Sequence, residues 1–132
     1  MAVKSFVIGK TTFNAAMAPA VEQDELLSLL SMTVMQRIFA AQATTTPQRA
    51  LVPIFMSLPV QVKSRCAEIL TRKVTVSGSS VSVSVHDFEG RMVEWNKLLG
   101  ELTEWNLSDF FIWLADVAAE ENPPVKQNKS KQ

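Results

Sequence analysis

Residues 88–114 read FEGRMVEWNKLLGELTEWNLSDFFIWL, and this stretch decides the fold class. Its first apolar residues recur at intervals of four, three, four and three, at Phe88, Met92, Trp95, Leu99 and Leu102. A second run has intervals of three, four and three, at Leu107, Phe110, Leu114 and Val117. Such spacing is typical of amphipathic helices. The stretch therefore predicts two successive helices, and we expect Asn106 to cap the second one, with Asp109 three residues further on.

The preceding residues predict further helices. Apolar residues at helical spacing run from about Val21 to about Gln42. A shorter helix is expected from Pro47, capped by Thr46 and limited or kinked by Pro53. Another helix is expected to start near Pro59.

Two segments alternate with the period of a strand. Residues 4–13 alternate around Gly9-Lys10 and indicate a short hairpin or an edge strand. Residues 74–85 alternate around Ser77-Gly78-Ser79-Ser80 and predict the clearer hairpin, with valines on one face. The predicted fold class is α+β and mostly helical, with about four to five helices and two short β-hairpins. We expect residues 1–122 to form a single globular domain and residues 123–132 to form a disordered, lysine-rich tail.

The 13 basic and 13 acidic residues cancel, but they are unevenly distributed. Residues 37–73 carry six basic residues against one acid, which is +5, and residues 74–121 carry nine acids against two basic residues, which is −7. Two interpretations stay open: these blocks attract each other within a chain or between copies, or they are two solvated faces that never meet.

Composition excludes several classes of protein. A chain that is 47% hydrophobic is not disordered throughout. No apolar run approaches the roughly 20 residues that cross a bilayer, so we expect no membrane association. Residues 1–15 lack the apolar core of a secretory signal. The one cysteine suits a reducing compartment, and we expect a cytoplasmic protein.

Motifs for catalysis and for cofactors are incomplete. Gly9-Lys10 ends like a phosphate-binding loop, but the glycine required five residues earlier is Lys4, so a turn is favoured. His86 and Cys66 are the only residues of their types, and too few ligands accompany them for a catalytic zinc site. We expect no metal, no cofactor and no catalytic residue, and a small hydrolase using Cys66 and His86 remains an alternative. The basic segment lacks interleaved aromatic residues, which argues against nucleic-acid binding.

An aromatic cluster is the strongest functional signal. Five large rings fall within 19 residues, at Trp95, Trp105, Phe110, Phe111 and Trp113. They exceed what one buried stripe per helix requires, so a protein–protein surface and a plain core both remain open interpretations. The candidate partner-binding residues are Leu98, Phe111, Trp113 and Trp105, together with Met35 and Phe39 of the long first helix. Leu98 and Trp113 lie off the stripes and are expected to be exposed.

The stretches Phe88–Gly100 and Trp105–Leu114, with the opening Phe6–Phe13, resemble the tail assembly chaperones of long-tailed phages and prophages. The resemblance implies a non-enzymatic protein of the bacterial cytoplasm that self-associates. It implies two partners, the tape measure protein, which such chaperones coat, and the tail tube protein, which then polymerises around it. It also implies that a longer form is made by ribosomal frameshifting. The alternatives are a structural or tail-completion protein that stays in the virion, and the Cys-dependent hydrolase.

Deleting residues 125–132 is expected to leave the melting temperature nearly unchanged. This segment contains three lysines and one apolar residue, so it has almost nothing to bury. Thermal denaturation of the full and the shortened chain, followed by circular dichroism, makes the comparison. A loss of several degrees would mean that the segment docks on the domain.

Overall fold

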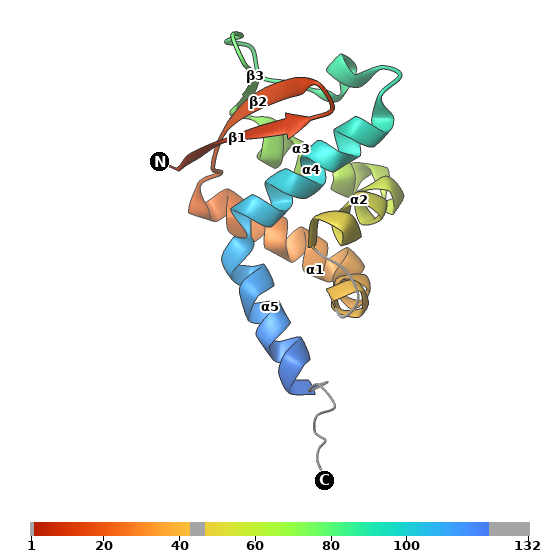
Figure 1. Cartoon of the computed structure of the whole chain (residues 1–132). Coiled ribbons are helices and arrows are strands. Elements are labelled where there is room, and N and C mark those ends of the chain that lie inside the picture. Colours follow the sequence, from red (N-terminus) through yellow and green to blue (C-terminus); the bar gives the residue numbers. More distant parts are fainter. Residues whose placement is uncertain (1, 43–46, 122–132) are drawn as a thin grey trace.

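A small antiparallel sheet is covered by helices in the computed structural model (Figure 1). The structure describes residues 2–42 and 47–121, and it describes no side chains for residues 33–42, 47–50 and 118–121. The elements are β1 (Val3–Ile8), β2 (Thr11–Ala16), α1 (Ala20–Gln42), α2 (Pro47–Ser57), α3 (Val60–Thr71), β3 (Val74–Val76), the short 3₁₀ helix η1 (Val85–Phe88), α4 (Met92–Asn106) and α5 (Ser108–Glu121). Five α-helices and a three-stranded sheet in these residues confirm the predicted α+β, mostly helical class. The predicted tail lies outside the described residues.

The predicted start of α2 at Pro47 agrees with the structure, and Pro53 does not end the helix. Helix α2 begins at Pro47 and continues through Pro53, while Thr46 lies outside the described residues. A proline inside a helix costs about 3 kcal/mol. The flanking side chains of Leu51, Ile54 and Phe55 are buried. Each such burial contributes about 1.5–3 kcal/mol, so packing outweighs the lost hydrogen bond.

The first hairpin forms around Gly9 and Lys10, as the turn interpretation predicts. Strands β1 and β2 pair in antiparallel register, with Ile8 opposite Thr11. Gly9 has a φ of +61°, and a Cβ atom on it would lie 2.7 Å from the Glu94 carboxylate of α4. Glycine therefore allows both the tight turn and the close approach of α4.

The second predicted hairpin is reduced to a single bridge, and its first arm also pairs with β2. Residues 74–76 pair with β2, and the second arm keeps one isolated bridge, between Thr75 and Ser82. The Val83 amide donates to the carbonyl of Val74 at 2.8 Å, and both side chains are buried. The chain then leaves the sheet to form η1. Pairing with β2 places Val74 in the core, which a separate exposed hairpin could not do.

Helix α4 is enclosed by its neighbours rather than lying on a surface. It packs against β1, η1, α2, α3 and α5. Leu98, Leu99 and Leu102 are fully buried, and the buried positions Asn96, Gly100 and Thr103 extend the buried part further around the helix axis. The prediction that Leu98 is exposed was therefore wrong, and Met92, expected on the buried stripe, is 47% exposed. A helix that contacts a sheet on one side and helices on others buries more than one stripe.

Ion pairs join the basic middle segment to the first helix. Arg65 donates from Nε and Nη2 to the two carboxylate oxygens of Glu25, at 2.6 and 2.7 Å. Arg72 pairs with Glu22 of the same helix. These arginines therefore pair with α1 rather than with the acidic segment 74–121. Attraction between the basic segment of one copy and the acidic segment of another stays a prediction.

The junction of α4 and α5 differs from the prediction at Asn106. Leu107 alone separates the two helices, and Asn106 is the last residue of α4, so it does not cap α5. Its buried side chain accepts a hydrogen bond from the Ala18 amide at 2.9 Å and donates one to the Leu102 carbonyl at 2.9 Å. The residue therefore ties the end of α4 to the segment between β2 and α1.

Replacing Asn106 with Ala is expected to lower the free energy of unfolding by about 1–3 kcal/mol, because the Ala18 amide loses its buried acceptor. Asn14→Ala is the matched control, since Asn14 accepts its hydrogen bond from Ser5 at the exposed surface. The control should change stability by no more than about 0.5 kcal/mol. Urea denaturation of both variants makes the comparison. Equal losses of stability in the two variants would show that the buried hydrogen bonds of Asn106 contribute no more than the exposed one of Asn14.

Candidate partner-binding surface

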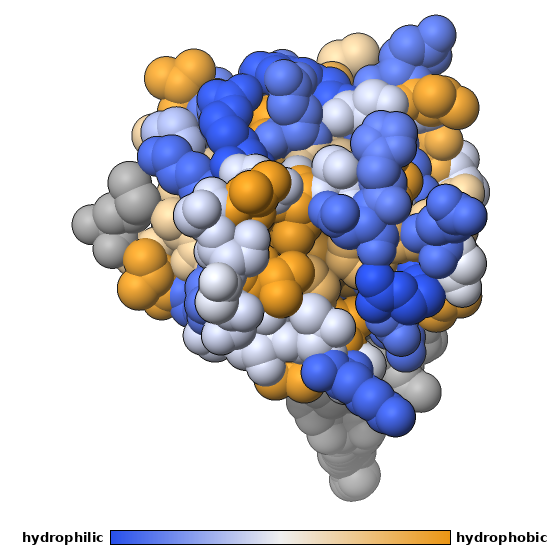
Figure 2. Space-filling model, turned by 90° about the horizontal axis from the view of Figure 1, so that it is seen from above, coloured by the Kyte–Doolittle hydropathy of each residue, from blue (hydrophilic) through white to orange (hydrophobic). Residues whose placement is uncertain are grey.

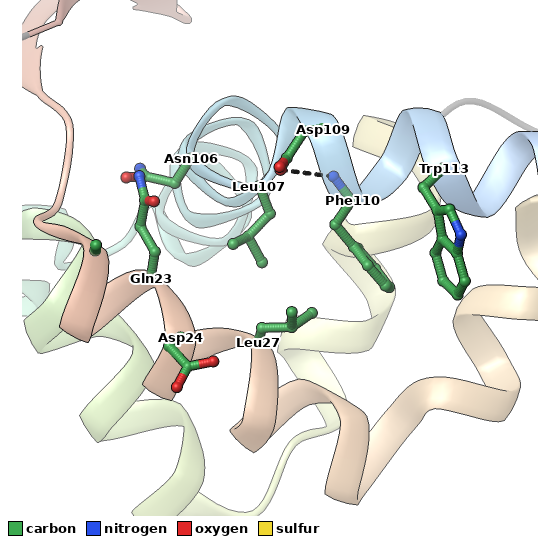
Figure 3. Close-up of a pocket in the computed structure, with 9 residues that line it drawn as sticks. Gln23, Asp24, Leu27, Asn106, Leu107, Asp109, Phe110 and Trp113 are labelled. Carbon is green, nitrogen blue, oxygen red and sulfur yellow. Dashed lines mark hydrogen bonds between the residues drawn. The ribbon is translucent and has the colours of Figure 1, made fainter.

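A groove of about 370 Å³ lies between α1 and α5 (Figure 3). Figure 3 shows the rings of Phe110 and Trp113 pointing from α5 toward α1, with Leu27 of α1 pointing back toward them. Both charged side chains in its lining are acidic, Asp24 and Asp109. The groove therefore combines apolar side chains with polar ones, and its charged groups are both negative.

The aromatic side chains of α5 form a path from the core to the surface. Phe111 is buried, and its ring centroid lies 5.2 Å from that of the half-buried Phe110. The Phe110 centroid lies 5.9 Å from that of Trp113, which is 54% exposed. Helix α5 itself projects away from the sheet (Figure 1). Packing of Phe110 on both sides holds the Trp113 ring beside the groove, which makes it a pre-ordered contact.

The predicted partner-binding residues separate into different environments. Trp113 is exposed, as predicted, and lines the groove. Trp105 is half-buried, with its ring 5.6 Å from that of Phe6 in an edge-on contact. Phe111 is 3% exposed, so it packs in the core and offers no surface.

For the other three candidate residues, the structure describes no exposed side chain. Leu98 is fully buried in α4. Met35 and Phe39 belong to the part of α1 whose side chains are not described. Sequence reasoning missed Leu27 as a groove residue and Ile112 as an exposed one, although Ile112 is 66% exposed. The signal for Ile112 was its place beside Trp113, off the helical stripe.

A second hollow lies at the other end of α4. It has a volume of about 500 Å³ and runs between α3 and the segment formed by η1 and the start of α4. Its lining includes the exposed side chains of Met56, Val60, Val85 and Met92. Figure 2 views the molecule from the end that carries β3 and η1, and hydrophobic side chains gather in the middle of that face. Nothing in the sequence pattern indicated this second groove.

The two residues of the hydrolase alternative lie in different environments. Cys66 is fully buried in α3, and burial raises the pKa of its thiol to about 11. The thiol is therefore neutral at pH 7, whereas the thiolate is the nucleophile. His86 is exposed on η1.

Two further features are absent from the part of the chain that the structure describes. Among these residues, no group of three or more His, Cys, Asp or Glu side chains is placed to hold a metal ion. None of the helices there combines the length and hydropathy needed to cross a bilayer.

Trp95 and Trp113 are expected to respond differently to replacement by Ala. Trp95 is 4% exposed and stacks near Phe88, so Trp95→Ala should lower stability by about 3–5 kcal/mol. Trp113→Ala should stay within about 0.5 kcal/mol of the parent. Chemical denaturation followed by far-UV circular dichroism measures both. Equal losses would place Trp113 in the core and remove it as a candidate for binding.

This geometry suits recognition of another protein chain. An exposed tryptophan held beside a groove is the kind of residue on which binding energy concentrates in interfaces. The acidic rim adds a charge preference for the partner. Searches of protein-family models, curated proteins and solved structures find no match to this chain.

Proposed function

We propose that the chain is a non-enzymatic tail assembly chaperone of a phage or prophage. It binds an apolar helix of the tape measure protein in the groove between α1 and α5, until tail tube subunits polymerise around that protein. The observation that carries the proposal is the half-exposed Trp113, held beside the groove by Phe110. The resemblance of the residues around Trp95 and Trp105 to such chaperones supplies the identity of the partners.

The groove suits a helical partner on physical grounds. Helices bind in grooves by inserting apolar residues spaced three and four apart, and aromatic walls provide the largest contact area. Asp24 and Asp109 at the rim favour a partner whose apolar face is flanked by Lys or Arg. The groove therefore selects an amphipathic helix with basic edges rather than any exposed apolar segment.

A structural virion protein is the alternative that shares most of this surface chemistry. A chaperone leaves the tail once it is assembled, whereas a structural or tail-completion protein stays. Mass spectrometry of purified particles separates them. We expect the chain to be abundant in infected or induced cells and absent from particles.

Trp113→Ala is expected to weaken binding to the tape measure protein roughly 30-fold, which corresponds to about 2 kcal/mol for an interface anchor. The measurement is co-expression with the tape measure protein of the same genome, followed by affinity purification and titration. Ile112→Ala is the matched control, because Ile112 is exposed on the same helix but does not line the groove. The control should bind like the parent. Binding that both variants retain unchanged would contradict the assignment of this groove.

A further inference from the structure

The groove between α3 and the start of α4 contains one charged group that lacks an opposite charge. Its charged lining residues are Lys63 and Glu68, and Glu68 accepts a hydrogen bond from Arg65 at 2.8 Å. Lys63 donates from Nζ to the amide oxygen of Asn96 at 2.6 Å. Among the described residues no carboxylate pairs with Lys63. Two of its three N–H donors therefore remain for a ligand.

The position of Lys63 is fixed by a buried side chain. Asn96 is 4% exposed, and its Nδ2 donates to the Met92 carbonyl at 2.7 Å, which orients its oxygen toward Lys63. Burial also lowers the pKa of the Lys63 amine from its ordinary value. A carboxylate that entered the groove would offset the desolvation of the ammonium group. The groove thus presents a held cation among exposed apolar side chains, so it suits an apolar segment that carries an acid.

Helix α5 has such a segment on its outer face. Asp109, Ile112 and Asp116 are all exposed and are spaced three and four residues apart, so they form one stripe. Ile112 lies two residues from Phe110, about 200° around the helix, so Ile112 points away from Phe110, while Asp109 at one end of the stripe also borders the α1–α5 groove. From Ser108 to Glu121 the helix has acidic residues and no Lys or Arg.

We propose that the Asp109–Ile112–Asp116 stripe of one copy docks in the α3–α4 groove of a second copy. Ile112 contacts the apolar lining, and an aspartate of the stripe accepts hydrogen bonds from Lys63. A chain cannot fill its own groove. Met92, in the groove, and Asn106, after which α5 begins, are the two ends of a 15-residue helix about 22 Å long.

The two docking surfaces belong to different parts of the molecule, so the contact is head-to-tail. Such contacts generate a ring when the rotation closes and an open row when it does not. The contact forms between copies of this chain alone, and Ile112 and Asp116 do not line the Trp113 groove. The inference therefore goes beyond the proposed function and does not depend on the tape measure protein.

Complementation between two variants of the full chain tests the contact. Met92→Asp places a charge in the groove, and Ile112→Asp places one in the stripe. Both residues are exposed, so both variants should fold. Sedimentation velocity should show the parent associating and each variant as a monomer of 14.6 kDa. An equimolar mixture should form a dimer that grows no further, because one intact stripe meets one intact groove.

Two further variants serve as controls for charge. Val81→Asp adds a charge at an exposed valine that is not part of the groove, and it should associate like the parent. Lys63→Gln should weaken association and reduce its dependence on salt, since exposed charges are screened over about 10 Å at 0.1 M. The proposal is overturned by a parent that stays monomeric at every concentration, by a mixture that stays monomeric, or by an Ile112→Asp variant that associates normally. These readouts use no tape measure protein, so they are independent of the test of the proposed function.

Discussion

Helix α4 is enclosed along most of its length, and this constraint arranges the rest of the molecule. From Trp95 to Asn106 only Lys97 is exposed. Because β1 packs against the helix as well as α2 and α3, side chains that leave its axis in several directions all reach the core. Both grooves contain residues of α4, with Asn106 in one and Met92 in the other. The helix therefore sets the distance between the two candidate binding surfaces.

The helices could be predicted from the sequence because their apolar spacing is a local property. The pairing of residues 74–76 with β2 could not, because a strand can pair with partners that are distant in the sequence. Alternating valines at residues 74–85 show only that a strand can form there, and β2 offers Val74 a place in the core. The prediction that Leu98 is exposed failed for a related reason. The spacing of apolar residues gives the direction of one face, but not the number of elements that pack around a helix.

The candidate surface was predicted in part. Trp113 could be identified because it lies off the buried stripe of its own helix, and that argument needs only sequence positions. The α3–α4 groove could not be identified in this way. Lys63 and Asn96 are 33 residues apart and meet only after α3 has packed on α4. A lysine among polar neighbours in sequence gives no indication that its amine will be partly buried.

The single-residue junction at Leu107 places α5 directly after the side chain that holds the Ala18 amide. Phe111 and Leu114 anchor α5 in the core, while Ile112 and Trp113 of the same helix are exposed. A partner that bound along α5 would therefore lie close in sequence to the hydrogen bonds that join the end of α4 to the segment between β2 and α1.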